Sequence, residues 1–304
     1  MNWNWNLVSY RKIWFTFSTL LVIPCIIAIA VFGFNWGIDF TGGTIIDLNF
    51  AQPVTVAQVR EAVTDDGLGA STIQLSGNVD SESGHDVMIR THNLSAEETN
   101  TVVAHVQQKL GDVDVKRIES VGAVIGSEVT EHALINLLVA FAALIAYISY
   151  RFEYRIGISC IIAITHDILV VLGTFALFQL EIDASFLAAI LTVIGYSMNE
   201  SVVIFDRVRE NLRTHRKTDS YETLANDSIK QSITRSFYTL TTVLFAVGSL
   251  YFFGGETTKN FALVMLVGFI SGAYSSLCIA TSLWVVWRNY DGKKHHSVRT
   301  KKNS

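Results

Sequence analysis

Long apolar runs alternate with short polar stretches over most of the chain. The first run, Ile13–Phe34, contains 22 residues and no charged side chain. A helix of this length, at about 1.5 Å of rise per residue, crosses the roughly 30 Å hydrocarbon core of a bilayer. The pattern therefore predicts an α-helical polytopic membrane protein with six transmembrane helices. The other five runs cover about Ala133–Tyr150, Ile156–Leu177, Ala184–Phe205, Ser232–Phe253 and Phe261–Trp287.

The stretch between the first and second runs, from Gly37 to about Glu128, has the composition of a water-soluble domain. Apolar and polar residues alternate in four segments of this stretch, which is the pattern of half-buried strands. The four predicted strands are Thr44–Phe50, Ser71–Gly77, Asp86–Thr91 and Val113–Val121.

Two capping boxes place helices between these strands. Thr55 precedes Gln58 and Ser95 precedes Glu98, and each pair is followed by apolar residues at helical spacing. The resulting order of elements, β-α-β-β-α-β, is that of a ferredoxin-like fold. We therefore expect a ferredoxin-like α+β domain between transmembrane helices 1 and 2.

The composition agrees with a membrane protein, because 50% of the residues are hydrophobic and only 16% are charged. The predicted α+β domain holds 14 acidic and 5 basic residues between 37 and 128, a net charge of −9, which argues against a nucleic-acid partner. Its histidines and the three cysteines of the chain have no metal-binding or redox spacing. We therefore expect no metal or organic cofactor.

The uneven distribution of basic residues predicts the orientation in the membrane. Sixteen of the 23 Lys and Arg residues lie before the first run, between the second and third, between the fourth and fifth, or after the sixth. The intervening loops, 178–183 and 254–260, hold only Lys259. Since cytoplasmic loops are enriched in Lys and Arg, we expect both termini in the cytoplasm and the α+β domain in the periplasm.

These signals divide the chain into four parts. Residues 1–36 are expected to form a cytoplasmic N-terminus and transmembrane helix 1, and residues 37–130 the periplasmic domain. Residues 131–288 would hold transmembrane helices 2–6, with a cytoplasmic segment at 207–231. Residues 289–304 would form a basic cytoplasmic tail.

Glu200 lies in the middle of the fourth apolar run. A carboxylate in hydrocarbon costs several kcal/mol unless it is neutralised or paired, so this position indicates either a functional group or a structural bracket. Arg235, near the start of the next run, is expected at a similar depth, because both lie roughly 7.5 to 9 Å from a cytoplasmic helix end. An ion pair between them would lower the desolvation cost of each. His166 and Asp167 form a second polar level nearer the bilayer centre.

Three motifs carry a family resemblance. They are GYSMNESVVIFDRVREN at 195–211, NWGIDFTGG at 35–43 and SVGAVIG at 120–126. The motifs resemble the signatures of the SecF family, the smaller membrane subunit of the bacterial SecD–SecF protein-export complex in the resistance-nodulation-division superfamily. With the loop order, the resemblance covers nearly all of the chain.

The resemblance implies that the acid at Glu200 and the arginine at Arg235 take part in ion-driven movement. We expect an ion-coupling relay of these two residues with Asn199, Asp167 and His166. The other motif positions are expected to be structural; they are Asp39, Phe40, Thr41, Gly42, Gly43, Gly122, Gly126, Gly195, Tyr196, Asp206 and Arg207.

Two positions depart from the family pattern. Glu200 stands where the family usually has Asp, which lengthens the side chain by one methylene and changes its reach toward Arg235. Ala123 stands where the family usually has proline, between Gly122 and Gly126. The link between the α+β domain and the membrane therefore lacks one rigid residue.

The resemblance further implies that the chain uses the transmembrane gradient of protons, or of Na⁺, to drive late-stage translocation of preproteins through the Sec channel. The implied partners are SecD, the Sec translocon channel and its ATPase, a YajC-like small membrane subunit, an unfolded preprotein and membrane lipid, at the bacterial cell inner membrane. The chain is not expected to be an enzyme, and it contains no Gly-x-x-x-x-Gly-Lys-[Ser/Thr] loop for nucleotide hydrolysis.

Three alternatives compete with this interpretation. The chain could be a half-transporter of the resistance-nodulation-division superfamily that exports small molecules or lipids. It could be a non-transporting scaffold in which Glu200 and Arg235 only brace the helices. An intramembrane aspartyl protease would need two apposed carboxylates, for which Asp167 and Glu200 are candidates, but the chain has no Gly-x-Gly-Asp motif.

Overall fold

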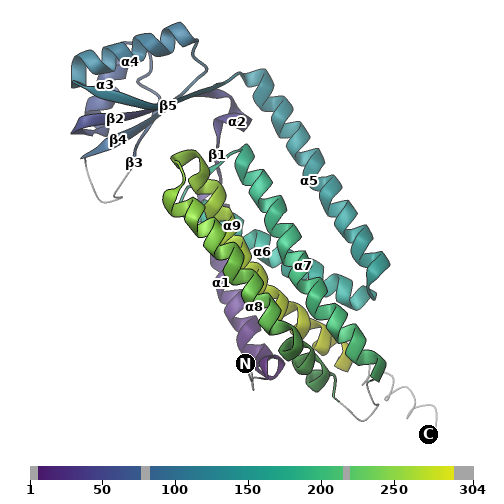
Figure 1. The fold of residues 1–304 in the computed structure, drawn as a ribbon. Coiled ribbons are helices and arrows are strands. Elements are labelled where there is room, and N and C mark those ends of the chain that lie inside the picture. Colours follow the sequence, from purple (N-terminus) through teal and green to yellow (C-terminus); the bar gives the residue numbers. More distant parts are fainter. Residues whose placement is uncertain (1–5, 77–82, 215–219, 291–304) are drawn as a thin grey trace. The chain divides into compact units, whose positions relative to one another are not determined.

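The computed structural model describes residues 6–76, 83–214 and 220–290. The chain divides into two compact units (Figure 1). One unit is Trp36–Ile135, which we call the α+β unit. The other combines Met1–Asn35 with Asn136–Ser304, and we call it the helical unit.

The α+β unit contains a four-stranded antiparallel sheet whose strand order is β3-β4-β2-β5. The first strand of this sheet, β2, therefore lies between its third, β4, and its fourth, β5, which is the ferredoxin-like arrangement that the sequence predicted. β2 extends beyond the predicted Phe50 because its pairing with β4 resumes at Val54 after an irregularity. The elements are β2 (Gly43–Thr55), α3 (Val56–Thr64), β3 (Thr72–Ser76), β4 (Ser83–Thr91), α4 (Ala96–Leu110) and β5 (Val113–Val121); Gly77, at the end of one predicted strand, lies outside the described residues.

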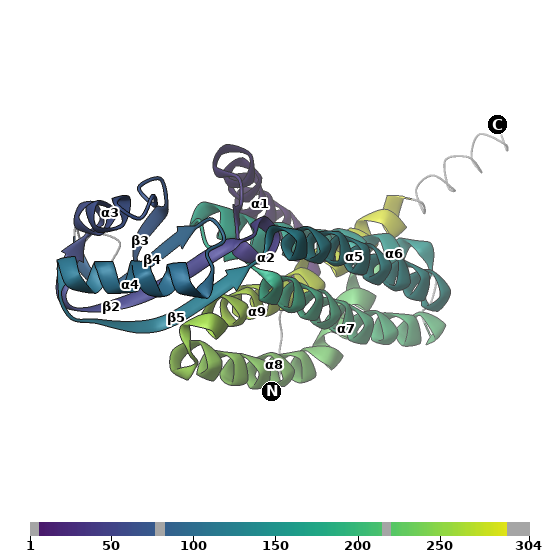
Figure 2. The same cartoon turned by 90° about the horizontal axis from the view of Figure 1, so that it is seen from above.

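The helices α3 and α4 pack on the same face of this sheet (Figure 2). Ile46, Leu48 and Phe50 alternate along β2 and are buried against Val59 of α3 and Val102 of α4. The period of two in the strand and the 3.6-residue period of the helices thus meet in one apolar core.

The two predicted capping boxes are both formed. Thr55 Oγ1 accepts a hydrogen bond from the Gln58 backbone N–H at 3.2 Å, and Gln58 Oε1 accepts one from the Thr55 N–H at 2.9 Å. Ser95 and Glu98 make the same reciprocal pair at 3.2 and 2.8 Å. The Ser95 backbone N–H and hydroxyl hold the pKa of the Glu98 carboxyl below its ordinary value.

Replacing Ser95 by Ala is expected to weaken the first turn of α4 by about 1 kcal/mol, because the Glu98 N–H then loses its acceptor. Amide hydrogen exchange in α4 of the full chain should report this loss, and Ser95→Thr should restore most of the protection. Glu98→Gln should weaken the same turn near neutral pH. Because the folded-state pKa of Glu98 is lowered, the contribution of the carboxylate to stability is lost as the pH falls through that pKa. Below it, amide hydrogen exchange in α4 should be similar in Glu98→Gln and in the unmodified chain.

The glycines of two motifs, NWGIDFTGG and SVGAVIG, meet inside the α+β unit. The short helix α2 (Ile38–Thr41) ends at Gly42, and α5 (Ala123–Arg151) begins directly beside it. A Cβ added to Gly42 would lie 2.9 Å from Ala123 Cα, and one added to Gly126 would lie 3.1 Å from the Gly42 nitrogen. These glycines therefore allow two backbone segments far apart in the chain to pack closely.

Thr41, Phe40 and Gly122 of the two motifs have local contacts, and Ala123 stands at the start of a helix. Thr41 Oγ1 donates to the Gly37 carbonyl at 3.1 Å, and the Phe40 ring packs edge-on against Trp36. Gly122 has only an ordinary contact with Asn93, so space does not require a glycine there. Ala123 is the first residue of α5, a position where a proline fits a helix without loss of a hydrogen bond.

The described residues contain six helices long and apolar enough to cross a membrane, as the sequence predicted. In the helical unit α1 packs on α6, and α8 and α9 both pack on α7 (Figure 1). The spans are Leu7–Phe32, Ala123–Arg151, Tyr154–Leu177, Ala184–Thr214, Tyr221–Phe253 and Thr258–Tyr290. They include η1 (Leu7–Tyr10), α1 (Arg11–Phe32), α5, α6 (Tyr154–Leu177), α7 (Ala184–Thr214), α8 (Tyr221–Phe253), α9 (Glu256–Tyr274) and the π-helical η2 (Ser275–Ala280); the two-residue strands are β1 (Asn35–Trp36) and β6 (Glu181–Ile182).

Several helices are longer than the apolar runs that predicted them. α7 continues past Phe205 to Thr214, and α8 begins at Tyr221 with Ser220 as its N-cap. Much of the segment expected at 207–231 is therefore helical, because polar residues continue the helical hydrogen bonding beyond an apolar span. Residues 215–219 and 291–304, which include most of the predicted basic tail, lie outside the described residues.

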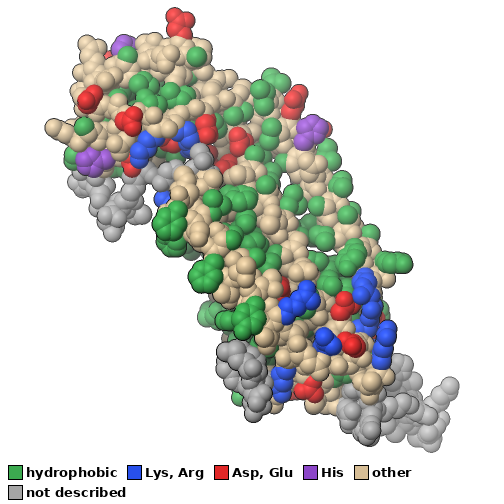
Figure 3. All heavy atoms as spheres, in the orientation of Figure 1, with side chains coloured by type: hydrophobic (Ala, Val, Ile, Leu, Met, Phe, Trp, Pro, Cys, Tyr) green, Lys and Arg blue, Asp and Glu red, His purple; other side chains and the backbone are tan. Residues whose placement is uncertain are grey.

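Lys and Arg side chains gather at one end of the helical unit, where α5 ends and α6 begins (Figure 3). Arg151, the last residue of α5, contacts Asp206 of α7 at 3.0 Å. Arg209 donates to the Arg151 carbonyl at 3.3 Å. Several basic residues that are distant in the chain therefore share one end of the helices.

Candidate functional site

Asp167 lies in the interior of the helical unit on α6, where its side chain is 1% exposed. Three serine hydroxyls donate to it. Ser271 Oγ reaches Asp167 Oδ1 at 2.6 Å, while Ser197 and Ser275 reach Oδ2 at 2.6 and 2.7 Å. His166 Nδ1 lies 3.1 Å from Oδ1. The carboxylate thus joins α6 to α7, α9 and η2.

A π-helical turn in the last transmembrane helix shapes this centre. Consecutive residues of an α-helix point about 100° apart, yet Ser275 and Ser276 of η2 are both fully buried. Ser275 donates to Asp167, and Ser276 lies 2.9 Å from the Ser201 hydroxyl of α7. Two adjacent serines of this turn therefore contact two different helices. Such turns occur frequently at functional sites.

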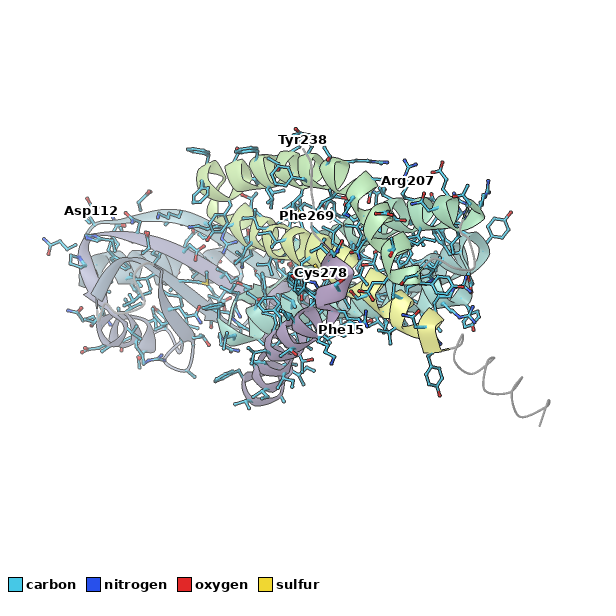
Figure 4. The ribbon with its side chains drawn as sticks, turned by 90° about the horizontal axis from the view of Figure 1, so that it is seen from below. Phe15, Asp112, Arg207, Tyr238, Phe269 and Cys278 are labelled. Carbon is cyan, nitrogen blue, oxygen red and sulfur yellow. The ribbon has the colours of Figure 1, made fainter. Side chains whose placement is uncertain are left out.

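Glu200 is also buried, with 3% of its surface exposed. Its neighbours one turn back on α7 define the direction it faces. The Tyr196 ring packs at 4.5 Å from the Phe269 ring of α9, and a Cβ on Gly272 of α9 would lie 3.1 Å from Ser197. Because residues three and four apart share one face of a helix, Glu200 points toward α9. Figure 4 shows Phe269 inside the helical unit and Tyr238 on the outer face of α8.

Arg235 and Asn199 lie instead in a cleft of about 330 Å³ between α7 and α8. Asp206, Arg207, Gln231 and Ser232 also line it. Arg207 pairs with Glu210 at 2.7 Å, so this part of the motif makes surface ion pairs.

The expected ion pair between Glu200 and Arg235 is not formed: within the described parts of the chain, no hydrogen bond or ion pair joins them. α7 and α8 do pack together, as the expected neighbourhood of the two residues requires. Helical rise predicted their similar depth, but the direction of each side chain depends on the packing partners. The structure therefore separates a buried acidic face of α7 from a cleft that holds the arginine.

Sequence reasoning missed Ser197, Ser276 and the π-helical turn. Ser271 and Ser275 were visible as part of a stripe of small residues on the last helix, a pattern that close helix packing explains equally well. Their spacing of four residues opposite a buried acid was the available signal. Nothing in the sequence indicated that Ser276 would turn inward beside Ser275.

Close contact between α7 and α9 depends on glycines of α9 rather than on Gly195. A Cβ on Gly268 would lie 2.3 Å from Val193 Cγ2, whereas one on Gly195 would meet nothing within 4 Å. Gly268→Ala is therefore expected to cost about 1 to 3 kcal/mol of stability through overpacking. Thermal unfolding of the full chain in detergent tests this, with Gly195→Ala as the matched control. Equal stability of the two variants would contradict it.

Comparisons with known proteins agree with this architecture. Residues 101–290 match the family model described as protein export membrane protein SecD/SecF, C-terminal, and residues 27–54 match the SecD/SecF GG motif. The chain is 45% identical to protein translocase subunit SecF of Acidaminococcus fermentans over 284 residues, 93% of this chain and 97% of that protein. It is 36% identical to protein translocase subunit SecF of Escherichia coli O157:H7 over 275 residues, 88% and 83% of the two chains.

The crystal structure of SecDF from Thermus thermophilus superposes on 95% of this chain with a TM-score of 0.85 and 31% identity. A second SecDF crystal structure, in a super-membrane-facing form, matches with a TM-score of 0.70 and 30% identity. The chain spans only 39% of the length of the first SecDF chain and 40% of the second.

The six spans and the α+β unit between the first and second define a multi-pass membrane protein with a separate α+β unit. Within that class, the chain belongs to the SecD/SecF family of protein-export membrane proteins and aligns with its SecF subunits. The predicted family, the fold class and the prediction of a transport subunit rather than an enzyme are therefore confirmed.

Proposed function

We propose that the chain acts with a SecD subunit to drive late-stage translocation of preproteins through the Sec channel, using the transmembrane proton gradient. The observation that carries this proposal is the pair of buried carboxylates, Asp167 and Glu200, inside membrane-spanning helices. Ionisable groups at such depth are costly and usually serve ion or proton movement. A proton crossing the full potential gains about 2.3 kcal/mol per 100 mV, enough over a few protons to bias two helix arrangements.

The proposed relay begins in the cleft between α7 and α8. Asn199 lines this cleft and directly precedes Glu200 in α7. Protonation of Glu200 removes a charge from its contact face with α9 and changes how α7 packs. His166 and Asp167 form the second level of the relay. The resulting helix shift would move the α+β unit and help draw a polypeptide outward.

The proposed orientation places both termini in the cytoplasm of a bacterial cell and the α+β unit in the periplasm, at the inner membrane. Support comes from the basic residues gathered at one end of the helical unit and from the net charge of −9 over residues 37–128 (Figure 3).

The proposed partners are SecD, the Sec translocon channel and its ATPase, a YajC-like small membrane subunit, an unfolded preprotein and membrane lipid. In the similar SecDF structure the matching region is part of a longer chain, which supports a SecD partner for this one. Large apolar side chains on α1 and α8 are exposed, among them Leu20, Val31, Phe245 and Phe252, and these faces are open to lipid or to a partner helix.

The test is preprotein translocation into inverted membrane vesicles that carry SecD and this chain, with and without a proton gradient. Glu200→Gln and Arg235→Met should abolish the gradient-dependent part, while Glu200→Asp keeps it. Asp227→Asn, an exposed carboxylate of α8 that does not line the cleft, is the matched control. A Na⁺ gradient in place of the proton gradient tests the alternative coupling ion. If Glu200→Gln works as well as the unmodified chain, Glu200 is a structural bracket and the scaffold alternative gains support.

A further inference from the structure

The two ring nitrogens of His166 have different surroundings. The residue is 7% exposed, and its Nδ1 lies 3.1 Å from Asp167 Oδ1. Its Nε2 is buried, and among the described residues no group hydrogen-bonds to it. A buried ring nitrogen without a partner is uncommon, because its desolvation is then uncompensated.

Asp167, in contrast, has all of its acceptor positions used. An ionised carboxylate only accepts hydrogen bonds, and its two oxygens offer about four sites. Oδ1 receives Ser271 and His166, and Oδ2 receives Ser197 and Ser275. A proton added to either oxygen would force one of these donors to turn away. The four contacts therefore favour the ionised carboxylate, to which His166 Nδ1 donates its hydrogen.

From this geometry we propose that His166 is the group of the buried centre that takes and releases the coupling proton, and that Asp167 stays ionised as its fixed counter-charge. The proton binds the lone pair of Nε2, the Nδ1–H stays in place, and the ring becomes an imidazolium beside the carboxylate. This assignment rests on the proposed ion coupling. It also selects protons over Na⁺, because an imidazole nitrogen is a poor ligand for a hard cation.

The surroundings of His166 suit a ring that becomes charged. The Tyr274 ring of α9 lies 6.0 Å away between centroids, within the range where an aromatic face attracts a cation. Tyr274 is itself held, since its hydroxyl donates to the Trp14 carbonyl of α1 and bonds Ser18 Oγ, both at 2.9 Å. The other titratable side chains in the apolar parts of the helices packed on α6 are Cys25, Tyr196, Glu200 and Cys278.

The test is ¹⁵N nuclear magnetic resonance of the full chain in lipid nanodiscs with labelled histidine, the His166 signals being identified by their loss in His166→Gln. At high pH we expect hydrogen on Nδ1 and a bare Nε2, and imidazolium signals as the pH is lowered. Asp167→Asn should lower the imidazolium fraction at least about tenfold at the midpoint of the unmodified chain. Ser271→Ala removes the donor that shares Oδ1 and should raise that fraction. A merely structural pair would not give changes of opposite sign.

The proposal is overturned if His166 stays neutral at every pH at which the chain remains folded, or if infrared spectra show that Asp167 is the group that protonates. His166→Gln should also abolish gradient-dependent translocation in the vesicle assay, and full retention would overturn the coupling role. The two proposals fail separately. If His166 stays neutral in the spectra but Glu200→Gln loses gradient-dependent translocation, only the His166 proposal fails. If His166 becomes charged but translocation is unchanged in both Glu200→Gln and His166→Gln, the proposed function fails.

Discussion

Asp167→Ala is expected to lower the free energy of unfolding by about 3 to 5 kcal/mol, the largest loss that we predict for a single side chain. The substitution leaves His166 and three serine hydroxyls buried without their acceptor, and it opens a cavity where three helices and the π-helical turn meet. Each orphaned buried donor costs about 1 to 3 kcal/mol, part of which rotation of the serine hydroxyls recovers.

The measurement is unfolding of the full chain in mixed micelles on titration with a denaturing detergent, followed by circular dichroism. Asp227→Ala is the matched control, because Asp227 lies on α8 in an exposed pair with Lys230 at 3.8 Å. Exposed pairs contribute about 0 to 1 kcal/mol. If Asp167→Ala costs no more than Asp227→Ala, the serine contacts do not hold the helices together.

The elements that the sequence predicted well depend on local signals. Both capping boxes follow from residues within one turn of chain, and the four strands and six spans follow from the hydrophobic pattern of one continuous segment each. The sheet order followed from the sequence of elements, because few topologies connect β-α-β-β-α-β compactly. The sequence did not predict the polar ends of α7 and α8. Hydropathy locates the segment that crosses the hydrocarbon, but it does not show where helical hydrogen bonding stops.

The candidate site was only partly predictable, because sequence gives depth along a helix but not the direction of its side chains. Glu200 and Arg235 were expected at one level, yet Glu200 of α7 faces α9, whereas Arg235 of α8 lines the cleft between α7 and α8. That difference is set by which helix packs on which face of α7. The π-helical turn at η2 is likewise a tertiary feature, stabilised by contacts of Ser275 and Ser276 with two other helices.

Gly43→Ala is expected to destabilise the α+β unit by about 3 kcal/mol. Gly43 has a φ of +134°, which L-residues rarely adopt, and an added Cβ would lie 2.5 Å from the carbonyl oxygen of Thr91. That oxygen belongs to the backbone of β4, so relief of the contact requires β2 and β4 to separate at the start of their pairing, Thr44 opposite Thr91. The cost therefore combines backbone strain with a steric clash.

Gly67→Ala provides the matched control, since Gly67 also has a positive φ, +76°, but its Cβ would meet nothing within 4 Å. We expect about 1 kcal/mol there, the strain alone. Hydrogen exchange of the β2 and β4 amides in the full chain separates the two variants, because only Gly43→Ala should open the first pairs of the ladder. Equal exchange in both would mean that the clash relaxes freely. The unequal result would make Gly43 a backbone requirement of the sheet.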